Sequence, residues 1–280
     1  MKEKIVQNLF GDYDVVVPTS KLGINYMGSK RTIAADIIEV IYNTVGEFDN
    51  FYDLFGGGGA MSYAVAELTS ANVYYNELNK GVAEFVKYLN IHKDLPKEWY
   101  DFVTRDIFFE NYDKETAYGG FVKTVYSFGG NQTSYLYGEP IEKIKQAAYE
   151  EAMAEGTFSK ANKKRIKIQQ EAKAGIRDET LVQLENFTRL VHVRNILSKG
   201  KLLTGVTSGS YDDVVFKKEG TVIYCDIPYE DTGEYQMGGF DHRKFEKWFL
   251  EQEVPVFVSS YKFNEGKLIM EKKKSVLMQG

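Results

Sequence analysis

The sequence predicts an α/β fold that carries an inserted, mostly helical subdomain. Two short apolar stretches each end at an acidic residue, Asp53 and Asp226, and the first of them runs into four consecutive glycines. The long region between these stretches is rich in aromatic and charged residues and low in proline. A strand, a glycine turn and a helix in this order are typical of an α/β unit, whereas the middle region has a helical composition.

The N-terminal part begins with a short apolar run over residues 15–17 and continues with Asn-Tyr-Met-Gly-Ser-Lys-Arg over residues 25–31. Apolar residues then recur at helical spacing and predict an amphipathic helix. They are Ile33, Ile37, Ile38 and Ile41. Taken alone, Lys30 and Arg31 would be a solvated charge pair, and Ser29 would be the cap of this helix.

A glycine cluster follows the first predicted strand of the sheet. Apolar residues lead to Asp53 and Phe55, four glycines follow over residues 56–59, and a helix is expected over residues 61–68. Glycine lets a backbone approach a ligand closely and adopt a positive φ. The next apolar run, over residues 72–75, ends near Glu77. An acid about 20 residues after such a loop suits a ribose diol. A flexible loop is the alternative interpretation of the glycines alone.

The middle region combines aromatic residues with local positive charge. A polar, aromatic and glycine-bearing loop over residues 129–138 has the residue types that contact bases, because Asn and Gln recognise adenine edges and aromatic rings stack. Helices are expected over about residues 142–173 and over residues 179–197. Residues 141–177 hold nine Lys or Arg against five Glu, which suggests a phosphate-binding surface. A glycine-rich surface loop and a solvated helix face are the alternatives.

The last part returns to an α/β pattern. Strands are expected over residues 202–206, 222–226, 254–259 and 275–278, with a helix over residues 242–250. The second of these strands ends with Asp226-Ile227-Pro228-Tyr229. A carboxylate and a neighbouring carbonyl can each accept a hydrogen bond from an amine and prepare it for attack on a methyl group. Pro228 favours an extended Ile227. A strand-end turn is the alternative, since Asp and Pro favour turns.

Length and composition limit the function classes. A chain of 280 residues with 43% hydrophobic residues predicts one α/β domain with an insertion. The single cysteine, Cys225, excludes an intrachain disulfide framework, and three scattered histidines give no metal-site spacing. The sequence has no signal peptide and no long apolar run, so we expect a cytoplasmic protein without a membrane span or a metal. The net charge of −5 argues mildly against a nucleic-acid partner, although basic clusters such as residues 272–274 are present.

Together, these motifs and their order resemble the Dam-type (D12 class) family of S-adenosylmethionine-dependent DNA adenine-N6 methyltransferases. Tyr26, Gly28 and Lys30 match the family's N-terminal motif, whereas Asn25 stands where many members carry lysine. The glycine loop is similar to the F-x-G-x-G loop around the cofactor. Residues 226–229 resemble the catalytic D-P-P-Y tetrapeptide, with isoleucine at its second position.

The resemblance implies a Rossmann-like methyltransferase sheet with helices on both faces and a mostly helical recognition insertion. It divides the chain into a cofactor part (1–92), a target-recognition insertion (93–198) and a catalytic part (199–280). It also implies S-adenosylmethionine as cofactor and double-stranded DNA, with a flipped adenine, as partner.

The resemblance, with the residue types above, assigns three sets of site residues. The catalytic set, in which Asp226 and the Ile227 carbonyl accept hydrogen bonds from N6 and Tyr229 stacks on the base, is Asp226, Ile227, Pro228 and Tyr229. The cofactor set is Tyr26, Lys30, Asp53, Phe55, Gly56, Gly57, Gly58, Glu77, Ser210, Tyr211 and Asp226. The DNA-binding set is Asn131, Gln132, Tyr135, Tyr137, Lys163, Lys164, Arg165 and Lys167.

Two alternatives stay open at this point. A methyltransferase of the same fold could act on another amine, such as an RNA base or a protein glutamine. A methyltransferase-like binding protein could have lost turnover, and Ile227, Asn25 and the early end of the last sheet strand favour this possibility. The sequence leaves open the recognition sequence, the oligomeric state and whether the protein serves a restriction system.

Overall fold

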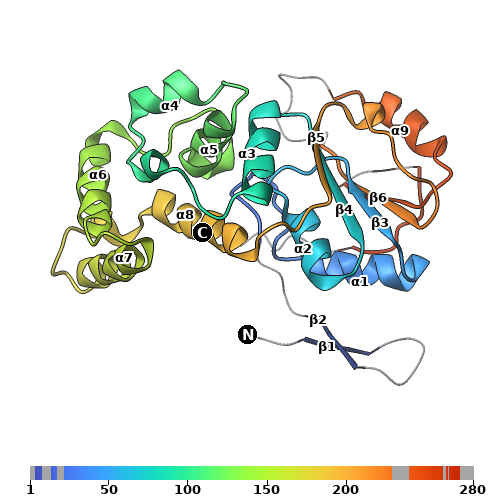
Figure 1. Ribbon diagram of the computed structural model, residues 1–280, viewed down its shortest axis with the longest axis horizontal. Helices are drawn as coiled ribbons and strands as arrows, with labels where there is room; N and C mark the ends of the chain where they lie inside the picture. Colours follow the sequence, from blue (N-terminus) through green and yellow to red (C-terminus); the bar gives the residue numbers. More distant parts are fainter. Residues whose placement is uncertain are drawn as a thin grey trace, which may run out of the picture.

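A parallel sheet of five strands forms the centre of the computed structural model, which describes residues 4–7, 14–17, 22–228, 240–260, 263 and 265–271. The strand order is β5-β4-β3-β6-β7, and all four pairings are parallel (Figure 1). The strands are β3 (Asn50–Asp53), β4 (Asn72–Glu77), β5 (Gly205–Ser208), β6 (Thr221–Asp226) and β7 (Val256–Ser259). A separate antiparallel hairpin joins β1 (Lys4–Gln7) to β2 (Asp14–Val17).

The strand order changes direction at β3. This strand pairs with β4 on one side and with β6 on the other, so that Asp53 lies opposite both Tyr75 and Tyr224. In an open parallel sheet, ligands bind beyond the carboxyl ends of the strands at such a switch point. Asp53, Glu77 and Asp226 are the last residues of β3, β4 and β6, and they therefore share this edge, which we call the acid edge.

Helices cover both faces of the sheet, as the sequence predicts. Successive side chains of a strand point to opposite faces. Phe51 packs into the larger core with α1 (Ala34–Val45) and α2 (Ala60–Leu68), whereas its neighbour Tyr52 belongs to a second cluster that contains Phe245 of α9 (His242–Leu250). The alternation fixes the register of the strands, because a slip by one residue would exchange the two faces.

The middle of the chain forms a helical part at one end of the molecule, with α6 and α7 farthest from the sheet (Figure 1). Its helices are η1 (Lys97–Tyr100), α4 (Arg105–Asn111), α5 (Ala117–Val125), η2 (Phe128–Gly130), α6 (Glu139–Met153), α7 (Phe158–Lys173), η3 (Glu179–Val182) and α8 (Glu185–Lys199). Helix α5 packs on α3 (Lys80–Ile91) at very short range. A Cβ on Gly120 would lie 2.0 Å from the Gly81 carbonyl oxygen, so the contact requires glycine at position 120.

Several elements differ from the sequence prediction. The helix expected over residues 142–173 is two helices, because Gly156 adopts a φ of +87° and Thr157 caps α7 by accepting a hydrogen bond from the Lys160 N–H. The helix expected over residues 179–197 is η3 followed by α8. Ser29 caps no helix, since α1 begins at Ala34 without a side-chain cap.

The strand expected over residues 202–206 begins only at Gly205. The side chain of Asn90 on α3 accepts hydrogen bonds from the backbone N–H groups of Leu202 and Leu203, at 3.0 and 2.9 Å, and donates to the Leu203 carbonyl at 2.9 Å. These backbone groups are thereby satisfied without a neighbouring strand. The strand expected over residues 275–278 and the lysines at 272–274 lie outside the described residues.

The contact between α3 and α5 gives a stability prediction. Gly120→Ala should lower the free energy of unfolding by about 1–3 kcal/mol, because the added methyl group forces two helix backbones apart. Urea unfolding monitored by circular dichroism measures this change. Gly138→Ala is the matched control, since the nearest atom to its added Cβ would be 3.8 Å away. Equal stability of the two variants would contradict the prediction.

Candidate active site

An ion pair joins the N-terminal motif to the end of β6. The Lys30 Nζ lies 2.6 Å from both Oδ1 and Oδ2 of Asp226, and the two side chains are 11% and 22% exposed. The same ammonium donates to the Gly28 carbonyl at 3.0 Å, and Gly28 has a φ of +77°, which favours glycine. Two motifs that lie almost 200 residues apart in the sequence thus meet at the acid edge.

Glu77 is a buried carboxylate at the end of β4. Its Oε1 accepts hydrogen bonds from the Asn79 N–H at 2.8 Å and from the Tyr26 hydroxyl at 3.5 Å, and its Oε2 accepts from the Gly57 N–H at 2.8 Å. Burial raises the pKa of Glu77, and these hydrogen bonds act in the opposite direction. Glu77 therefore connects the N-terminal motif, the glycine loop and the start of α3.

Asp53 is the most deeply buried carboxylate of the acid edge. The Ser62 hydroxyl donates to its Oδ2 at 2.7 Å, whereas its Oδ1 has no hydrogen-bond partner among the described residues. Burial raises the pKa of Asp53 to about 7, the charges of Asp226 and Glu77 add to this rise, and the hydrogen bond from Ser62 opposes it. An unsatisfied buried acceptor is costly, so Asp53 Oδ1 marks a place where a donor or a cation would be stabilised.

The glycines of the loop are required by the packing of the protein itself. A Cβ on Gly56 would lie 2.2 Å from the ring of Tyr75, and a Cβ on Gly58 would lie 2.6 Å from the Ile24 carbonyl oxygen. The Tyr75 hydroxyl donates to the Gly57 carbonyl at 2.7 Å, while the Gly57 N–H donates to Glu77. The loop is consequently held close to the acid edge on both sides.

Aromatic rings line the neighbouring end of the sheet. Phe55 stacks on Tyr211, with ring centroids 5.3 Å apart and an interplanar angle of 24°. Tyr211 begins the turn η4 (Tyr211–Asp213) directly after Ser210, whose hydroxyl donates to Asp212. The structure therefore brings the Ser210–Tyr211 pair to the glycine loop.

The tetrapeptide is described only in part. Ile227 is 2% exposed and belongs to the buried cluster of Cys225 and Phe245. Its side chain thus packs in the core below α9, which accounts for an apolar residue at this position. Tyr229 lies outside the described residues, so its stacking role stays a prediction.

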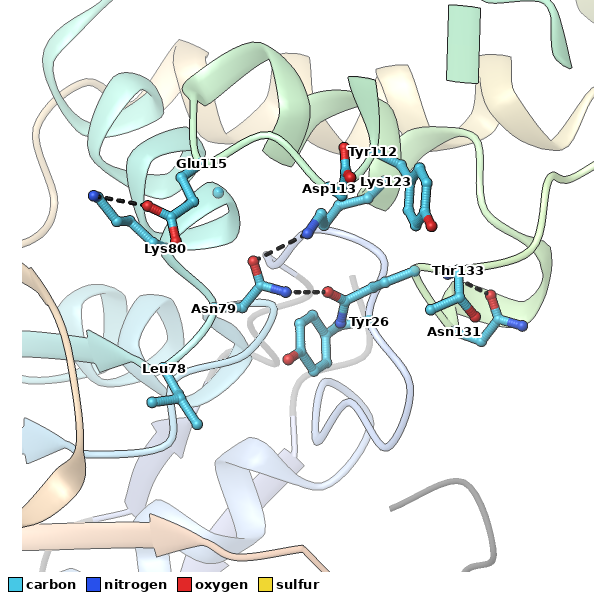
Figure 2. A pocket seen from close by; sticks show the side chains of 12 residues that line it. Tyr26, Leu78, Asn79, Lys80, Tyr112, Asp113, Glu115, Lys123, Asn131 and Thr133 are labelled. Atoms are coloured by element: carbon cyan, nitrogen blue, oxygen red, sulfur yellow. Dashed lines mark hydrogen bonds and ion pairs between the residues drawn. The ribbon is translucent and has the colours of Figure 1, made fainter. Parts of the chain in front are cut away.

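A cavity of about 470 Å³ lies between the helical part and the acid edge (Figure 2). Tyr26, Asn79, Lys123 and the loop residues Asn131 and Gln132 contribute to its wall. Figure 2 shows that the Asn79 side chain is hydrogen-bonded both to Lys123 and to the segment that bears Asn131 and Thr133. Two of the predicted DNA-binding residues therefore border a hollow next to the N-terminal motif.

The two tyrosines predicted to contact DNA in the same loop are buried. Tyr135 and Tyr137 are 6% and 4% exposed. The Tyr135 hydroxyl donates to the Val103 carbonyl at 2.8 Å, and the Tyr137 hydroxyl donates to Asn186 Oδ1 at 2.7 Å. Because both rings are buried, they are not accessible for a direct contact with nucleobases. Their hydrogen bonds instead hold the C-terminal end of the loop against the core.

The basic cluster lies on α7, in the part of the molecule farthest from the sheet (Figure 1). Most of its charges have neighbours. Lys164 pairs with Glu151 at 3.1 Å, Lys167 pairs with Glu171 at 3.7 Å, and Arg165 Nη1 donates to the Thr188 hydroxyl at 3.1 Å. Lys163 is exposed. The structure therefore does not bring this cluster to the acid edge.

Sequence reasoning missed three residues of the site. Asn79 carried a usable signal, because asparagine directly before a helix is a typical N-cap and its side chain accepts from the Val82 N–H at 3.3 Å. Ser62 and Lys123 carried none, since a serine and a lysine within helices are unremarkable.

Within the described ranges, no group of three or more His, Cys, Asp or Glu could hold a metal ion. The helices of the described part are all too short or too polar to cross a membrane.

The chain matches a known protein family over most of its length. The family described as D12 class N6 adenine-specific DNA methyltransferase matches residues 26–249. The matched range begins at Tyr26 of the N-terminal motif, contains the acid edge and the helical part, and ends one residue before the end of α9. No curated protein matches the chain.

The burial of Asp53 predicts a specific pH dependence of stability. The unfolded carboxyl ionises near pH 4, whereas the folded one, with its raised pKa, ionises near pH 7. The stabilising effect of the neutral carboxyl is therefore complete below about pH 4 and is lost as the pH rises to about 7. Asp53→Asn should remove this loss. Its unfolding free energy, relative to wild type, should rise by up to about 4 kcal/mol between these pH values.

Denaturant unfolding at intervals between pH 4 and pH 8 measures this difference. Asp213→Asn, which removes an exposed carboxylate, controls for the change in net charge. A constant difference between Asp53→Asn and wild type across the range would show that Asp53 is ionised in the folded protein throughout.

Proposed function

We propose a specific reaction for this chain, which belongs to the D12 class N6 adenine-specific DNA methyltransferase family. The reaction is the transfer of a methyl group from S-adenosylmethionine to the N6 amine of an adenine in double-stranded DNA, with the base flipped out of the helix. The observation that carries this proposal is the meeting of Asp53, Glu77 and Asp226 at one edge, with Tyr26 and Lys30 bonded to two of them.

The residues of the acid edge fit the cofactor chemically. S-adenosylmethionine supplies an electrophilic methyl group on a positively charged sulfur. Asp53 Oδ1 is a buried acceptor without a partner among the described residues, and it suits an ammonium or N–H group. Glu77 retains acceptor capacity for ribose hydroxyls, because a carboxylate has about four lone-pair sites. Phe55, Ser210 and Tyr211 would line the adenine end.

Asp226 and the Ile227 carbonyl would act on the substrate amine. Each would accept one N6 hydrogen bond, draw the nitrogen toward tetrahedral geometry and localise its lone pair for attack. Both Asp226 oxygens contact the Lys30 ammonium, and this contact favours the ionised carboxylate, which only accepts hydrogen bonds. Lys30 would thereby orient the acceptor before the amine arrives. The nitrogen would form its bond to the methyl carbon as the carbon–sulfur bond breaks, and the proton that it then loses would pass to Asp226 or to solvent.

Base flipping follows from the partial burial of this site. Asp226 is only 22% exposed and lies at the end of β6, beneath Lys30. An adenine that stays stacked in a duplex cannot bring its N6 amine to such a position, so the base has to leave the helix, at a cost of a few kcal/mol.

The DNA would lie over the cavity beside Tyr26. Asn131 and Gln132 remain the candidates for base contacts, because they border this cavity. Tyr135 and Tyr137 would support their loop from the core. Lys163 and Lys167 are exposed on α7 and remain candidates for phosphate contacts at a distance from the reacting base. Lys164 and Arg165 are weaker candidates, because they already contact Glu151 and Thr188.

Removal of the catalytic carboxylate tests the proposed reaction. Asp226→Ala should keep cofactor binding and lower methyl transfer by about 10²–10³-fold, the usual effect of losing one group that stabilises the transition state. Incorporation of labelled methyl groups into DNA adenine measures the transfer, and calorimetry measures binding. Asp226→Asn controls for side-chain volume. Turnover within about threefold of wild type would exclude the proposed role. Methylation of RNA or protein in place of DNA would exclude the substrate.

The cofactor role of Glu77 has its own test. Glu77→Gln should weaken S-adenosylmethionine binding roughly tenfold or more, since hydrogen bonds to a charged group contribute about 1.5–3 kcal/mol. Glu84→Gln on the exposed side of α3 removes the same charge outside the site. Isothermal titration calorimetry compares the two variants. Unchanged affinity of Glu77→Gln would remove this residue from the cofactor set.

A further inference from the structure

We propose that Asn79 is a positioning residue that couples cofactor binding to the conformation of the recognition loop, defined as residues 129–134. The inference rests on the proposed function, because it takes Glu77 as a cofactor ligand and the recognition loop as a DNA contact. It adds a residue that neither contacts the reacting atoms nor belongs to either predicted set.

Asn79 makes hydrogen bonds in three directions. Its backbone N–H donates to Glu77 Oε1 at 2.8 Å. Its Oδ1 accepts from the Lys123 Nζ at 3.2 Å, in addition to capping α3, and its Nδ2 donates to Gln132 Oε1 at 3.0 Å (Figure 2). The backbone of Asn79 therefore contacts the candidate ribose ligand, while its side chain connects helix α5 to the recognition loop.

Lys123 and the Val82 N–H together determine how the Asn79 amide is oriented. An amide can present either its oxygen or its nitrogen to a neighbour, but an ammonium and a backbone N–H only donate. The two donors therefore hold the Asn79 oxygen on their side, so the nitrogen is directed to Gln132. Lys123 is 7% exposed, and burial lowers its pKa, while the charges of Asp113, Glu77 and Glu115 oppose this shift. A buried lysine is costly, and its placement here is explained by this orienting contact.

The recognition loop is held under backbone strain. Gln132 has a φ of +68° and is, within the described part of the chain, the one residue other than glycine with a positive φ. Such a conformation costs roughly 1–3 kcal/mol and persists only where the surroundings fix it. The hydrogen bond from Asn79 supplies part of that restraint. The cavity beside the loop gives it room to change conformation when the bond is lost.

A second contact joins the loop to the cofactor side. A Cβ on Gly130 would lie 2.8 Å from Asn25 Nδ2 and 3.1 Å from the Met27 nitrogen, so the loop packs directly on the N-terminal motif. Tyr26, between these two residues, contacts Glu77. A ligand that binds Glu77 can thus change the conformation of the loop by two routes, one through Asn79 and one through Tyr26. Since coupling between two sites is reciprocal, cofactor should strengthen DNA binding by the same factor as DNA strengthens cofactor binding.

The test measures this coupling factor. S-adenosylhomocysteine, which carries no methyl group to transfer, is titrated into the full-length protein with and without a duplex that the wild type methylates. We expect the wild type to bind it at least fivefold more tightly with the duplex present. Asn79→Ser keeps a good helix cap but is too short to reach Gln132 or Lys123. Its coupling factor should fall toward one, while its affinity for each ligand alone changes less than about threefold.

Two lysines that border the same cavity provide the matched pair. Lys123→Met should lower the coupling factor in the same direction as Asn79→Ser but by less, because the Val82 N–H still holds the Asn79 oxygen after the Lys123 ammonium is removed. Lys80→Met, which removes an exposed pair with Glu115, should leave it unchanged. Circular dichroism and unfolding verify that each variant is folded.

The possible outcomes separate the two proposals. A folded Asn79→Ser variant that keeps the wild-type coupling factor would overturn the role of Asn79. So would a wild type that binds cofactor and methylates DNA but shows no coupling. A wild type that binds no cofactor, or transfers no methyl group to DNA, would overturn the proposed function itself, and the inference with it.

Discussion

The burial of Glu77 is the constraint on which the rest of the site depends. A carboxylate taken from water into a protein is unfavourable unless hydrogen bonds replace its solvation. For Glu77 the replacements are two backbone N–H groups and one hydroxyl, and they come from the glycine loop, the start of α3 and the N-terminal motif. The hydrogen bonds to this one buried carboxylate hold the three segments in place. They explain why residues far from the reacting atoms have defined positions.

The position of the helical part is also determined by residues near Glu77. This part rests on α3, the helix that begins three residues after Glu77, through the close approach of Gly81 and Gly120. Arg31 adds a second connection, because its Nη1 lies 2.9 Å from His192 Nδ1 on α8. The helical part is therefore connected to the sheet at two places, and a displacement of α3 would also displace its contact with α5.

The sequence was informative where local chemistry decides the structure. Acids at strand ends, glycines before a helix and the spacing of Ile37 and Ile41 all have local physical causes, and the sheet, α1 and the acid edge follow from them. The break at Gly156 was not predicted, although its local signal, a glycine followed by a capping threonine, is present in the sequence. The shift of β5 was not, because it depends on a side chain 113 residues away at Asn90. The burial of Tyr135 and Tyr137 was equally hidden, since a polar loop with aromatic residues has the same composition whether its rings point outward or inward.

The strand order also has a consequence for the order in which the protein is made. The strand β3 lies at the centre of the finished sheet, yet its neighbour β6 follows it by about 170 residues in the chain. At roughly 5–20 residues per second, a ribosome needs about 10–30 s to make that stretch. During this interval the edge of β3 that β6 will cover has no partner strand, and such an edge invites pairing with other chains. The helical part, which packs on α3 in the finished structure, is synthesised in the same interval, so its residues are available to fold before β6 completes the sheet.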